Sequence, residues 1–290
     1  MEHIQPANAL ELRQVSCHLG FFSLQDLNLT LPSGTILGLV GENGAGKTTA
    51  IRLIMNTLHR DSGDIRVLGC DNTSPEFLSI KEDIGVVLDE AYFPEVLTAK
   101  EVGGIMADTY AQWDSAQYQT FLTRFQLPGE KPFKAYSKGM KMKLAIAVAM
   151  SHHSRLLILD EATTGLDPLI RDEILTVFSE FTREPDHSIL ISSHITSDLE
   201  KLCDYVAFLH QGQLLFCEEK DRLLDICGMI TGTEELLESL QPEAIIARQE
   251  SQFGGIRVLV RKDLIPPTFS TDPVTLEEIV LFAAKGAEKA

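Results

Sequence analysis

The chain has 290 residues, 44% of them hydrophobic, with a formal net charge of −17 and a pI near 4.8. This length can bury a sizeable core, in one large domain with a smaller addition. The acidity argues against a nucleic-acid-binding surface, and no apolar run approaches the ~18–20 residues that span a bilayer.

The five cysteines are scattered along the chain, and no two of them form a C-x-x-C pair. This pattern indicates neither a disulfide framework nor a zinc site, and it is typical of small core residues in a reducing compartment. The first residues are polar, so we expect no signal peptide. We therefore expect a cytoplasmic protein, and any membrane role must come through a partner.

The first forty residues are expected to form strands. Apolar residues predict strands at 10–16 and 24–31, and an apolar run at 35–40 predicts a third, buried strand. Phe21 and Phe22 lie between the first two strands. An aromatic side chain there could stack on an adenine ring, but ordinary packing is the favoured interpretation.

A glycine-rich loop follows the third strand and opens a helix predicted from residue 48 to about 58. Its pattern, G-x-x-x-x-G-K-T, is that of a phosphate-binding loop, in which glycines let backbone N–H groups point inward at an anion. Lys47 would reach the β- and γ-phosphates, and the Thr48 hydroxyl would hold a magnesium ion. The alternative is a glycine-rich turn that matches by chance. The nucleotide-binding residues predicted here are Gly41, Asn43, Gly44, Gly46, Lys47, Thr48 and Thr49.

The next segment changes from strands to helices. Short strands are predicted at 65–68 and 84–88, the second one stopping at Asp89. A helical pattern then extends from residue 98 to about 132, and Asp114 is expected to cap a helix with an aromatic stripe. Such a stripe is more typical of a core than of a chemical site.

An alanine-rich helix is predicted at 143–150, led by Ser137 as a possible N-cap with Gly139 beside it. A capped helix start is a second possible anion site. The alternative is a simple solvated face, because lysines surround the cap and most capped helices bind nothing.

Two further strands end in polar side chains. The apolar run 156–159 precedes Asp160 and Glu161, and the run 188–191 precedes His194. The carboxyl ends of parallel strands are where such sheets bind ligands. Asp160 would hold magnesium through water, Glu161 would activate the attacking water, and His194 would contact the γ-phosphate. The alternative is that these residues only terminate strands.

The strand–helix alternation predicts an α/β fold, with a mostly parallel sheet and helices on both faces. A helix capped by Asp167, with Pro168 at its first position, precedes the strand at 188–191. A hairpin is predicted from strands 205–209 and 213–216. We expect one domain over residues 1–218.

The remaining residues, 219–290, are expected to form a small accessory α+β domain. Helices are predicted at 218–226, at 233–240 and from 275 to 285, and strands at 244–249 and 256–261. No catalytic constellation is visible there.

The motifs GENGAGKTT, YSKGMK, LLILDEATTGLDP and SSH occur in this order, and together they resemble those of the ATP-binding cassette (ABC) ATPases over roughly residues 8–218. The resemblance implies a P-loop NTPase fold with an antiparallel β subdomain and a helical subdomain at about 90–152 that docks on a membrane partner. It also implies ATP and Mg²⁺ as cofactors and a head-to-tail dimer, in which Ser137 and Gly139 of one subunit face the phosphate loop of the other. Glu161 would be the catalytic base and His194 the γ-phosphate sensor, with Lys47 completing the catalytic set, while Asp167 would communicate across the dimer.

The chain departs from the family pattern at three places. Lys138 stands where the family's signature usually has glycine, and Asp89 stands where a magnesium-sensing glutamine is usual. Leu19 falls close to the place of the adenine-stacking aromatic. We keep Asp89, with Thr48 and Asp160, as a candidate metal ligand.

The full pattern looks most like bacterial exporter ATPases of the antibiotic-resistance and acetoin-utilisation type. This implies a subunit held at the inner face of the membrane by a separate permease, paired with a copy of itself or with a second ABC ATPase. The alternatives are a soluble ABC ATPase outside transport and a regulatory module that binds ATP without turnover.

Overall fold

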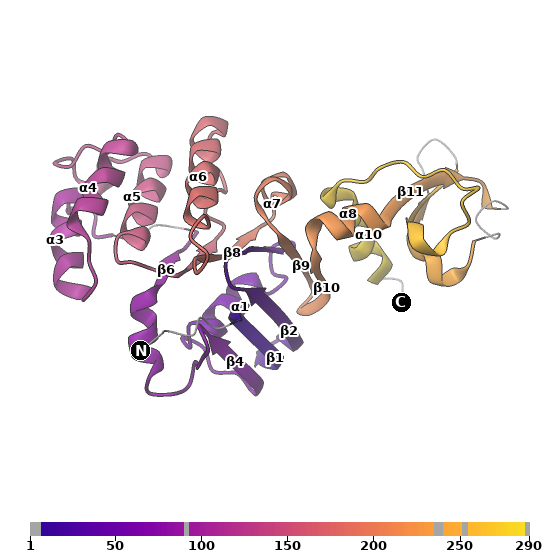
Figure 1. Ribbon diagram of the computed structural model, residues 1–290, viewed down its shortest axis with the longest axis horizontal. Coiled ribbons are helices and arrows are strands. Elements are labelled where there is room, and N and C mark those ends of the chain that lie inside the picture. Colours follow the sequence, from indigo (N-terminus) through magenta and orange to yellow (C-terminus); the bar gives the residue numbers. More distant parts are fainter. Residues whose placement is uncertain (1–6, 90–92, 235–239, 251–254, 288–290) are drawn as a thin grey trace.

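The structure, a computed structural model, describes residues 7–89, 93–234, 240–250 and 255–287. Within these residues, no helix is long and apolar enough to cross a membrane. Figure 1 shows helices α3, α4 and α5 at one end of the molecule, the strand-rich part with α1 in the middle, and the C-terminal segment with β11 and α10 at the other end.

A ten-stranded sheet forms the middle, with the order β5-β4-β1-β2-β10-β9-β3-β8-β7-β6. Its strands are β1 (Asn8–Leu19), β2 (Phe22–Pro32), β3 (Ile36–Val40), β4 (Ser62–Val67), β5 (Cys70–Asp71), β6 (Ile84–Val87), β7 (Leu156–Asp160), β8 (Ser188–Ser193), β9 (Tyr205–His210) and β10 (Gln213–Glu219). From β9 to β6 the neighbouring strands are parallel, whereas β1, β2, β4 and β5 pair antiparallel. The predicted α/β class, with a parallel sheet and an antiparallel part, is confirmed.

Nine helices are described, and those of the first two hundred residues lie among the strands of this sheet in chain order. They are α1 (Lys47–Ile54), α2 (Phe77–Ile80), α3 (Ala99–Thr109), α4 (Ser115–Arg124), α5 (Lys138–Met150), α6 (Pro168–Phe181), α7 (Thr196–Leu202), α8 (Lys220–Ile226) and α10 (Leu276–Ala287). Strands β3, β7 and β8 are buried along their whole length, as expected for a sheet covered on both faces.

A second, three-stranded antiparallel sheet has the order β11-β13-β12, formed by β11 (Cys227–Gly232), β12 (Ile245–Glu250) and β13 (Ile256–Arg261). Helix α10 packs on β12 and also contacts α7. Side chains of α10, among them Leu276, Ile279 and Phe282, belong to the same apolar cluster as residues of β3 and β9. The C-terminal segment therefore shares a core with the large sheet.

Several predicted boundaries are wrong. Helix α1 ends at Ile54 rather than near 58, because Asn56 adopts a left-handed conformation and the N–H of Thr57 bonds back to the carbonyl of Arg52. Strand β10 continues to Glu219, so α8 starts later than expected. Strand β11 was not predicted. Most of the helix predicted at 233–240 lies outside the described residues.

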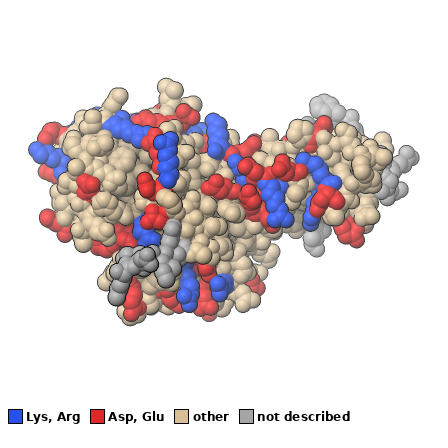
Figure 2. Space-filling view, in the orientation of Figure 1, with Lys and Arg blue, Asp and Glu red and all other residues tan. Residues whose placement is uncertain are grey.

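Charged side chains are spread over the face of the molecule drawn in Figure 2. On the face drawn in Figure 2, Lys and Arg side chains are interspersed with Asp and Glu over both ends of the molecule. The acidic net charge is therefore not gathered in one part of this face.

Strand β3 and helix α7 approach each other closely at Gly38. A Cβ atom on this residue would lie 2.9 Å from Sγ of Cys203 and 3.1 Å from Cδ2 of Leu199. Leu199 belongs to α7, and Cys203 follows the helix directly. The absence of a side chain at residue 38 thus sets the separation between β3 and α7.

A second close approach joins α3 and α4. The ring of Tyr118 on α4 is buried, and its hydroxyl donates a hydrogen bond to the carbonyl of Ala99 at 2.7 Å. A Cβ atom on Gly103 would lie 2.5 Å from this ring, whereas one on the neighbouring Gly104 would meet nothing within 4 Å. Both glycines lower the helix propensity of this segment. Only Gly103 is required by packing, because a side chain at residue 104 would meet no neighbour.

These two glycines provide a matched test. Alanine normally stabilises a helix interior relative to glycine, so Gly104→Ala is expected to raise the free energy of unfolding by about 0.5–1 kcal/mol. Gly103→Ala is expected to lower it by about 1–3 kcal/mol, because the fixed Tyr118 ring leaves no room for the methyl group. Urea denaturation of both variants measures the difference. Equal stabilisation by the two substitutions would contradict the packing argument.

Candidate functional site

Three neighbouring parallel strands bring the predicted polar residues to one edge of the sheet. In the register of the sheet, Val40 at the end of β3 lies opposite Ser193 of β8, and Asp160 at the end of β7 lies opposite Ser192. The phosphate-loop sequence follows β3 directly. The phosphate loop, the carboxylates at the end of β7 and the polar residues at the end of β8 therefore lie next to one another, because their strands are neighbours.

The loop after β3 has the backbone that the glycine pattern predicts. Gly44 and Gly46 have φ values of +83° and +112°, which side chains on L-residues rarely allow. A Cβ atom on Gly41 would lie 2.4 Å from the carbonyl oxygen of Leu209 in β9. Helix α1 begins at Lys47, so its first N–H groups face the space enclosed by the loop.

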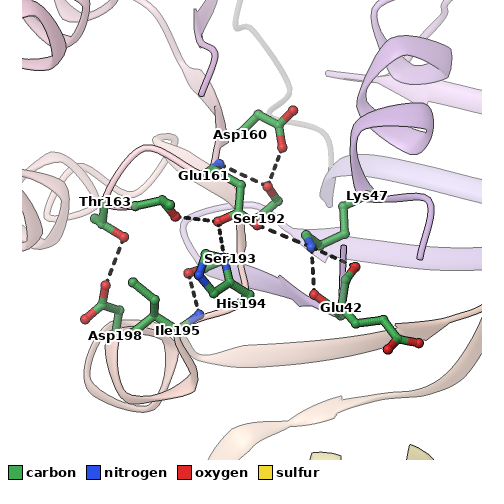
Figure 3. A network of polar contacts seen from close by, with 12 residues as sticks. Glu42, Lys47, Asp160, Glu161, Thr163, Ser192, Ser193, His194, Ile195 and Asp198 are labelled. Carbon is green, nitrogen blue, oxygen red and sulfur yellow. Dashed lines mark hydrogen bonds and ion pairs between the residues drawn. The ribbon is translucent and has the colours of Figure 1, made fainter. Parts of the chain in front are cut away.

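Lys47 is buried, with only 6% of the residue exposed. Its ammonium donates hydrogen bonds to the carbonyl oxygens of Gly41 at 2.6 Å and Glu42 at 3.2 Å, and it lies 3.2 Å from Oε1 of Glu161 (Figure 3). A buried ammonium needs such compensation, because its removal from water is costly. The loop thus closes around its own lysine.

Asp160 is also buried, and each of its carboxylate oxygens accepts a hydrogen bond. The hydroxyl of Thr48 donates to Oδ2 at 2.8 Å, and the hydroxyl of Ser192 donates to Oδ1 at 2.5 Å. Asp160 therefore connects the first turn of α1 to β8.

Glu161 directly follows β7, with a left-handed φ of +53°, and its side chain points toward the loop. Oε2 accepts a hydrogen bond from the Thr164 hydroxyl at 2.5 Å and lies 2.8 Å from Nδ1 of His194. Burial acts to raise the pKa of Glu161, but the hydrogen bond from Thr164, the charge of Lys47 and the contact with His194 outweigh it, so the pKa is lowered. Glu161 is thus ionised at neutral pH.

A cavity of about 490 Å³ lies against these residues. Of the residues predicted to bind nucleotide or metal, it is lined by Asn43, Gly44, Gly46, Lys47, Thr48, Thr49 and Asp89, and the predicted catalytic base Glu161 lines it as well. This volume is within the range of small-molecule and cofactor sites.

Other predicted residues lie elsewhere. His194 reaches Glu161 but lines a second cavity, which it shares with Gly41. Ser137 caps α5, accepting a hydrogen bond from the N–H of Met140, and neither it nor Gly139 lines either of these cavities. The two predicted anion sites, the phosphate loop and the start of α5, therefore do not share a cavity within one copy of the chain.

Several contributing residues were missed from the sequence. Ser192 donates a hydrogen bond to Asp160, and Thr164 donates one to Glu161. Both residues lie inside recognised motifs, but only their neighbours were predicted as site residues. Phe22, for which packing was the favoured interpretation, lines the larger cavity together with Leu19, whereas Phe21 is fully exposed. The sequence signal for Phe22 was its place after Gly20 and Phe21, where β2 begins.

Comparison with known proteins places these features in context. The model of the ABC transporter family matches residues 24–164. The ATP-binding protein YtrB of Bacillus subtilis is 32% identical over 215 residues, which are 74% of this chain and 73% of that protein. The bacitracin transport ATP-binding protein BcrA of Enterococcus faecalis is 35% identical over 65% of this chain and 62% of its own length.

Solved structures give the same result. A structure of the ATP-binding subunit of an ABC transporter is 28% identical, with a TM-score of 0.68, over 75% of this chain and 92% of that one. A dimeric ATP-binding cassette bound to ADP and phosphate has a TM-score of 0.64 at 20% identity, over 73% of this chain and 98% of that one, and shows the likeness of fold.

The hydrogen bond from the Ser192 hydroxyl to Asp160 can be tested by substitution. Ser192→Ala leaves a buried carboxylate oxygen of Asp160 without its donor, so we expect the free energy of unfolding to fall by about 1.5–3 kcal/mol. Ser193→Ala is the matched control on the same strand, because within the described part of the chain its hydroxyl accepts from the neutral N–H of Ile195 at 3.0 Å and contacts no carboxylate. Its expected loss is about 0.5–1.5 kcal/mol. Chemical denaturation compares the two, and a Ser192 variant no less stable than the Ser193 variant would contradict the arrangement around Asp160.

Proposed function

The chain belongs to the ABC transporter family, and from this premise we propose that it hydrolyses MgATP to drive the conformational cycle of a separate membrane permease. The observation that carries the proposal is the convergence of Lys47, Thr48, Asp160 and Glu161 at one edge of the sheet. Lys47 is a cation that can bind phosphate, and Glu161 is a carboxylate that can act as a base. Thr48 and Asp160 offer two oxygen ligands to a hard metal ion.

The residues present fit a nucleoside triphosphate. The loop N–H groups and the positive end of α1 favour an anion, and Lys47 supplies a full charge inside the loop. Phe22 lines the same cavity and offers a ring face for the base. Phosphate oxygens would replace the carbonyl of Glu42 and the carboxylate of Glu161 as contacts of the Lys47 ammonium.

The residues present also fit a magnesium ion that arrives with the nucleotide. The Thr48 hydroxyl and the Asp160 carboxylate lie side by side, and both are hard oxygen ligands of the kind Mg²⁺ takes. Among the described residues, no group of three or more His, Cys, Asp and Glu side chains could hold a metal ion by itself. When bound, the ion would neutralise phosphate charge, with Asp89 as a further candidate ligand at the cavity wall.

Glu161 has the features of a base for the attacking water. Its Oε1 atom is buried and accepts no hydrogen bond from the described residues, although Lys47 is 3.2 Å away. Movement of Lys47 toward phosphate would leave this oxygen open to a water molecule. His194 holds the other oxygen through Nδ1, so its Nε2 remains for the γ-phosphate.

Two copies of the chain, or this chain and a related one, would complete the site. Ser137 and Gly139 line no part of the phosphate cavity in their own subunit, and Ser137 already caps α5. We propose that they meet the γ-phosphate of a partner subunit, so that the site assembles only when ATP is present. Lys138 would then add a positive charge close to that phosphate.

The remaining parts of the chain take the roles that the resemblance implies. Helices α3, α4 and α5, within residues 90–152, would dock on the permease, which places the protein at the inner face of the membrane. We further propose a domain over residues 1–218 and an accessory domain over 219–290. Because one similar protein is named for bacitracin transport, we favour export as the direction.

Replacement of the proposed base tests the chemistry. Glu161→Gln is expected to keep ATP binding but to reduce kcat about 10²–10⁴-fold, because the amide cannot accept the proton of the attacking water. The dimer should then remain closed, which light scattering in the presence of ATP measures. Glu130→Gln makes the same change of charge at a side chain that is 80% exposed, and it should leave turnover unchanged. ATPase rates equal to those of the unaltered protein would remove Glu161 from the role of base.

Copurification separates the proposal from its alternatives. A transport subunit is expected to retain a membrane protein in detergent and to change its steady-state ATPase rate by several-fold when that protein is present. A soluble ABC ATPase outside transport would turn over without any membrane partner, and a regulatory module would bind ATP without turnover. Either result would overturn the transport function.

A further inference from the structure

Asp198 is a buried carboxylate that the proposed ATPase cycle does not use. It lies in the first turn of α7, four residues after His194, and only 3% of the residue is exposed. Its Oδ2 atom accepts a hydrogen bond from the hydroxyl of Thr163 at 2.9 Å, and Thr163 is itself fully buried (Figure 3). This bond joins α7 to the segment that follows β7.

Two contacts join the same pair of segments. Glu161 and Thr163 both follow β7, and His194 and Asp198 both follow β8. The first contact, between Oε2 of Glu161 and Nδ1 of His194, spans 2.8 Å at a histidine side chain that is 45% exposed. The second contact, between Thr163 and Asp198, is buried. Because a buried hydrogen bond is stronger than one that competes with water, the second contact is the one able to fix the spacing of the segments.

Helix α7 is itself fixed to the strand that leads into the phosphate loop. Leu199, the residue after Asp198, lies against β3 where Gly38 has no side chain. The N–H of Asp198 donates to the carbonyl of Ile195 at 3.2 Å, and a carboxylate in the first turn suits the helix dipole. The bond from Thr163 therefore attaches the segment of Glu161 to a rigid unit of β3 and α7.

Arg171 of α6 supplies the charge that compensates Asp198. Its Nη1 atom lies 3.4 Å from Oδ1 of the carboxylate. A buried ion pair adds little net stability, because the loss of hydration offsets the attraction. Stability alone therefore does not account for a carboxylate at this place, whereas the fixed orientation of α6, α7 and the segment after β7 does.

We propose that Asp198 is a positioning residue for ATP hydrolysis, which keeps His194 in contact with Glu161 through its bond to Thr163. Asp198 itself touches neither the nucleotide nor the attacking water, so the assignment rests on the roles proposed for Glu161 and His194. Loss of the bond would let the segment after β7 shift relative to His194. A misplacement of about 1 Å can cost about 10²-fold in rate.

The two partners of the bond can be changed separately. Thr163→Val removes the hydroxyl and keeps the branched shape, and Asp198→Asn keeps the size of the carboxylate but loses its charge. Each is expected to reduce the kcat of ATP hydrolysis by the full chain about 10- to 100-fold. The KM for ATP should stay within about threefold, because the phosphate loop takes no part in the bond. Thr163→Ser restores a hydroxyl and should recover most of the rate.

Two substitutions on α6 are the matched controls. Thr176→Val removes a hydroxyl that donates to the carbonyl of Asp172 in its own helix, and Asp172→Asn removes a charge at an exposed position. Both should leave kcat and KM unchanged. Unfolding curves show which variants are folded, and the comparison of Thr163→Val with Thr163→Ser carries the test if Asp198→Asn does not fold.

A double variant separates positioning from a general weakening of the structure. In His194→Ala the contact that Asp198 is proposed to maintain is already lost. Adding Thr163→Val or Asp198→Asn to His194→Ala should therefore lower kcat by less than about twofold, whereas independent structural effects would multiply.

The possible outcomes distinguish this assignment from the proposed function. Full turnover in folded Thr163→Val and Asp198→Asn, no recovery in Thr163→Ser, or multiplying effects in the double variants would overturn the role of Asp198. An unaltered rate in His194→Ala would overturn it too. If Glu161→Gln is impaired as expected, the proposed function survives each of these results. An unaltered rate in Glu161→Gln would remove the proposed base and the role of Asp198 together.

Discussion

The buried ammonium of Lys47 is the constraint on which the rest of the site depends. A charge with so little exposure must be compensated by oxygen atoms close by, and here these come from the loop itself and from Glu161. Because Glu161 follows β7, this single cation ties the ends of two strands together. The loop has its curled shape without a phosphate group, so nucleotide binding would require chiefly that Lys47 exchange its contacts with Glu42 and Glu161 for phosphate oxygens.

Much of this site followed from the sequence because one physical rule governs it. Parallel strands end at the same edge of a sheet, so polar residues placed after apolar runs had to gather near the phosphate loop. Asp160, Glu161 and His194 were predicted in this way, and the structure brings them within hydrogen-bonding reach of Thr48, Lys47 or one another. Their chemical roles remain predictions.

The parts that were missed depend on contacts that sequence spacing does not encode. Ser192 holds Asp160 only because β7 and β8 lie in a register that pairs the two residues. Strand β11 has a mixed sequence with glycine at its second and last positions and so no clear alternation, and its pairing with β13 decides its conformation. The periodicity of α10 predicted a helix, but it gave no indication that the helix would share its apolar face with the core of the large sheet.

The contact at Gly38 has a consequence for motion. Strand β3 leads into the phosphate loop, and α7 begins two residues after His194, so the missing side chain lets these two segments pack without a gap. Closely packed elements with buried contacts move as one rigid body rather than sliding past each other. Rotation that accompanies a nucleotide cycle would then have to be accommodated at the connections into the helical segment of α3, α4 and α5, while the two loops keep a constant spacing.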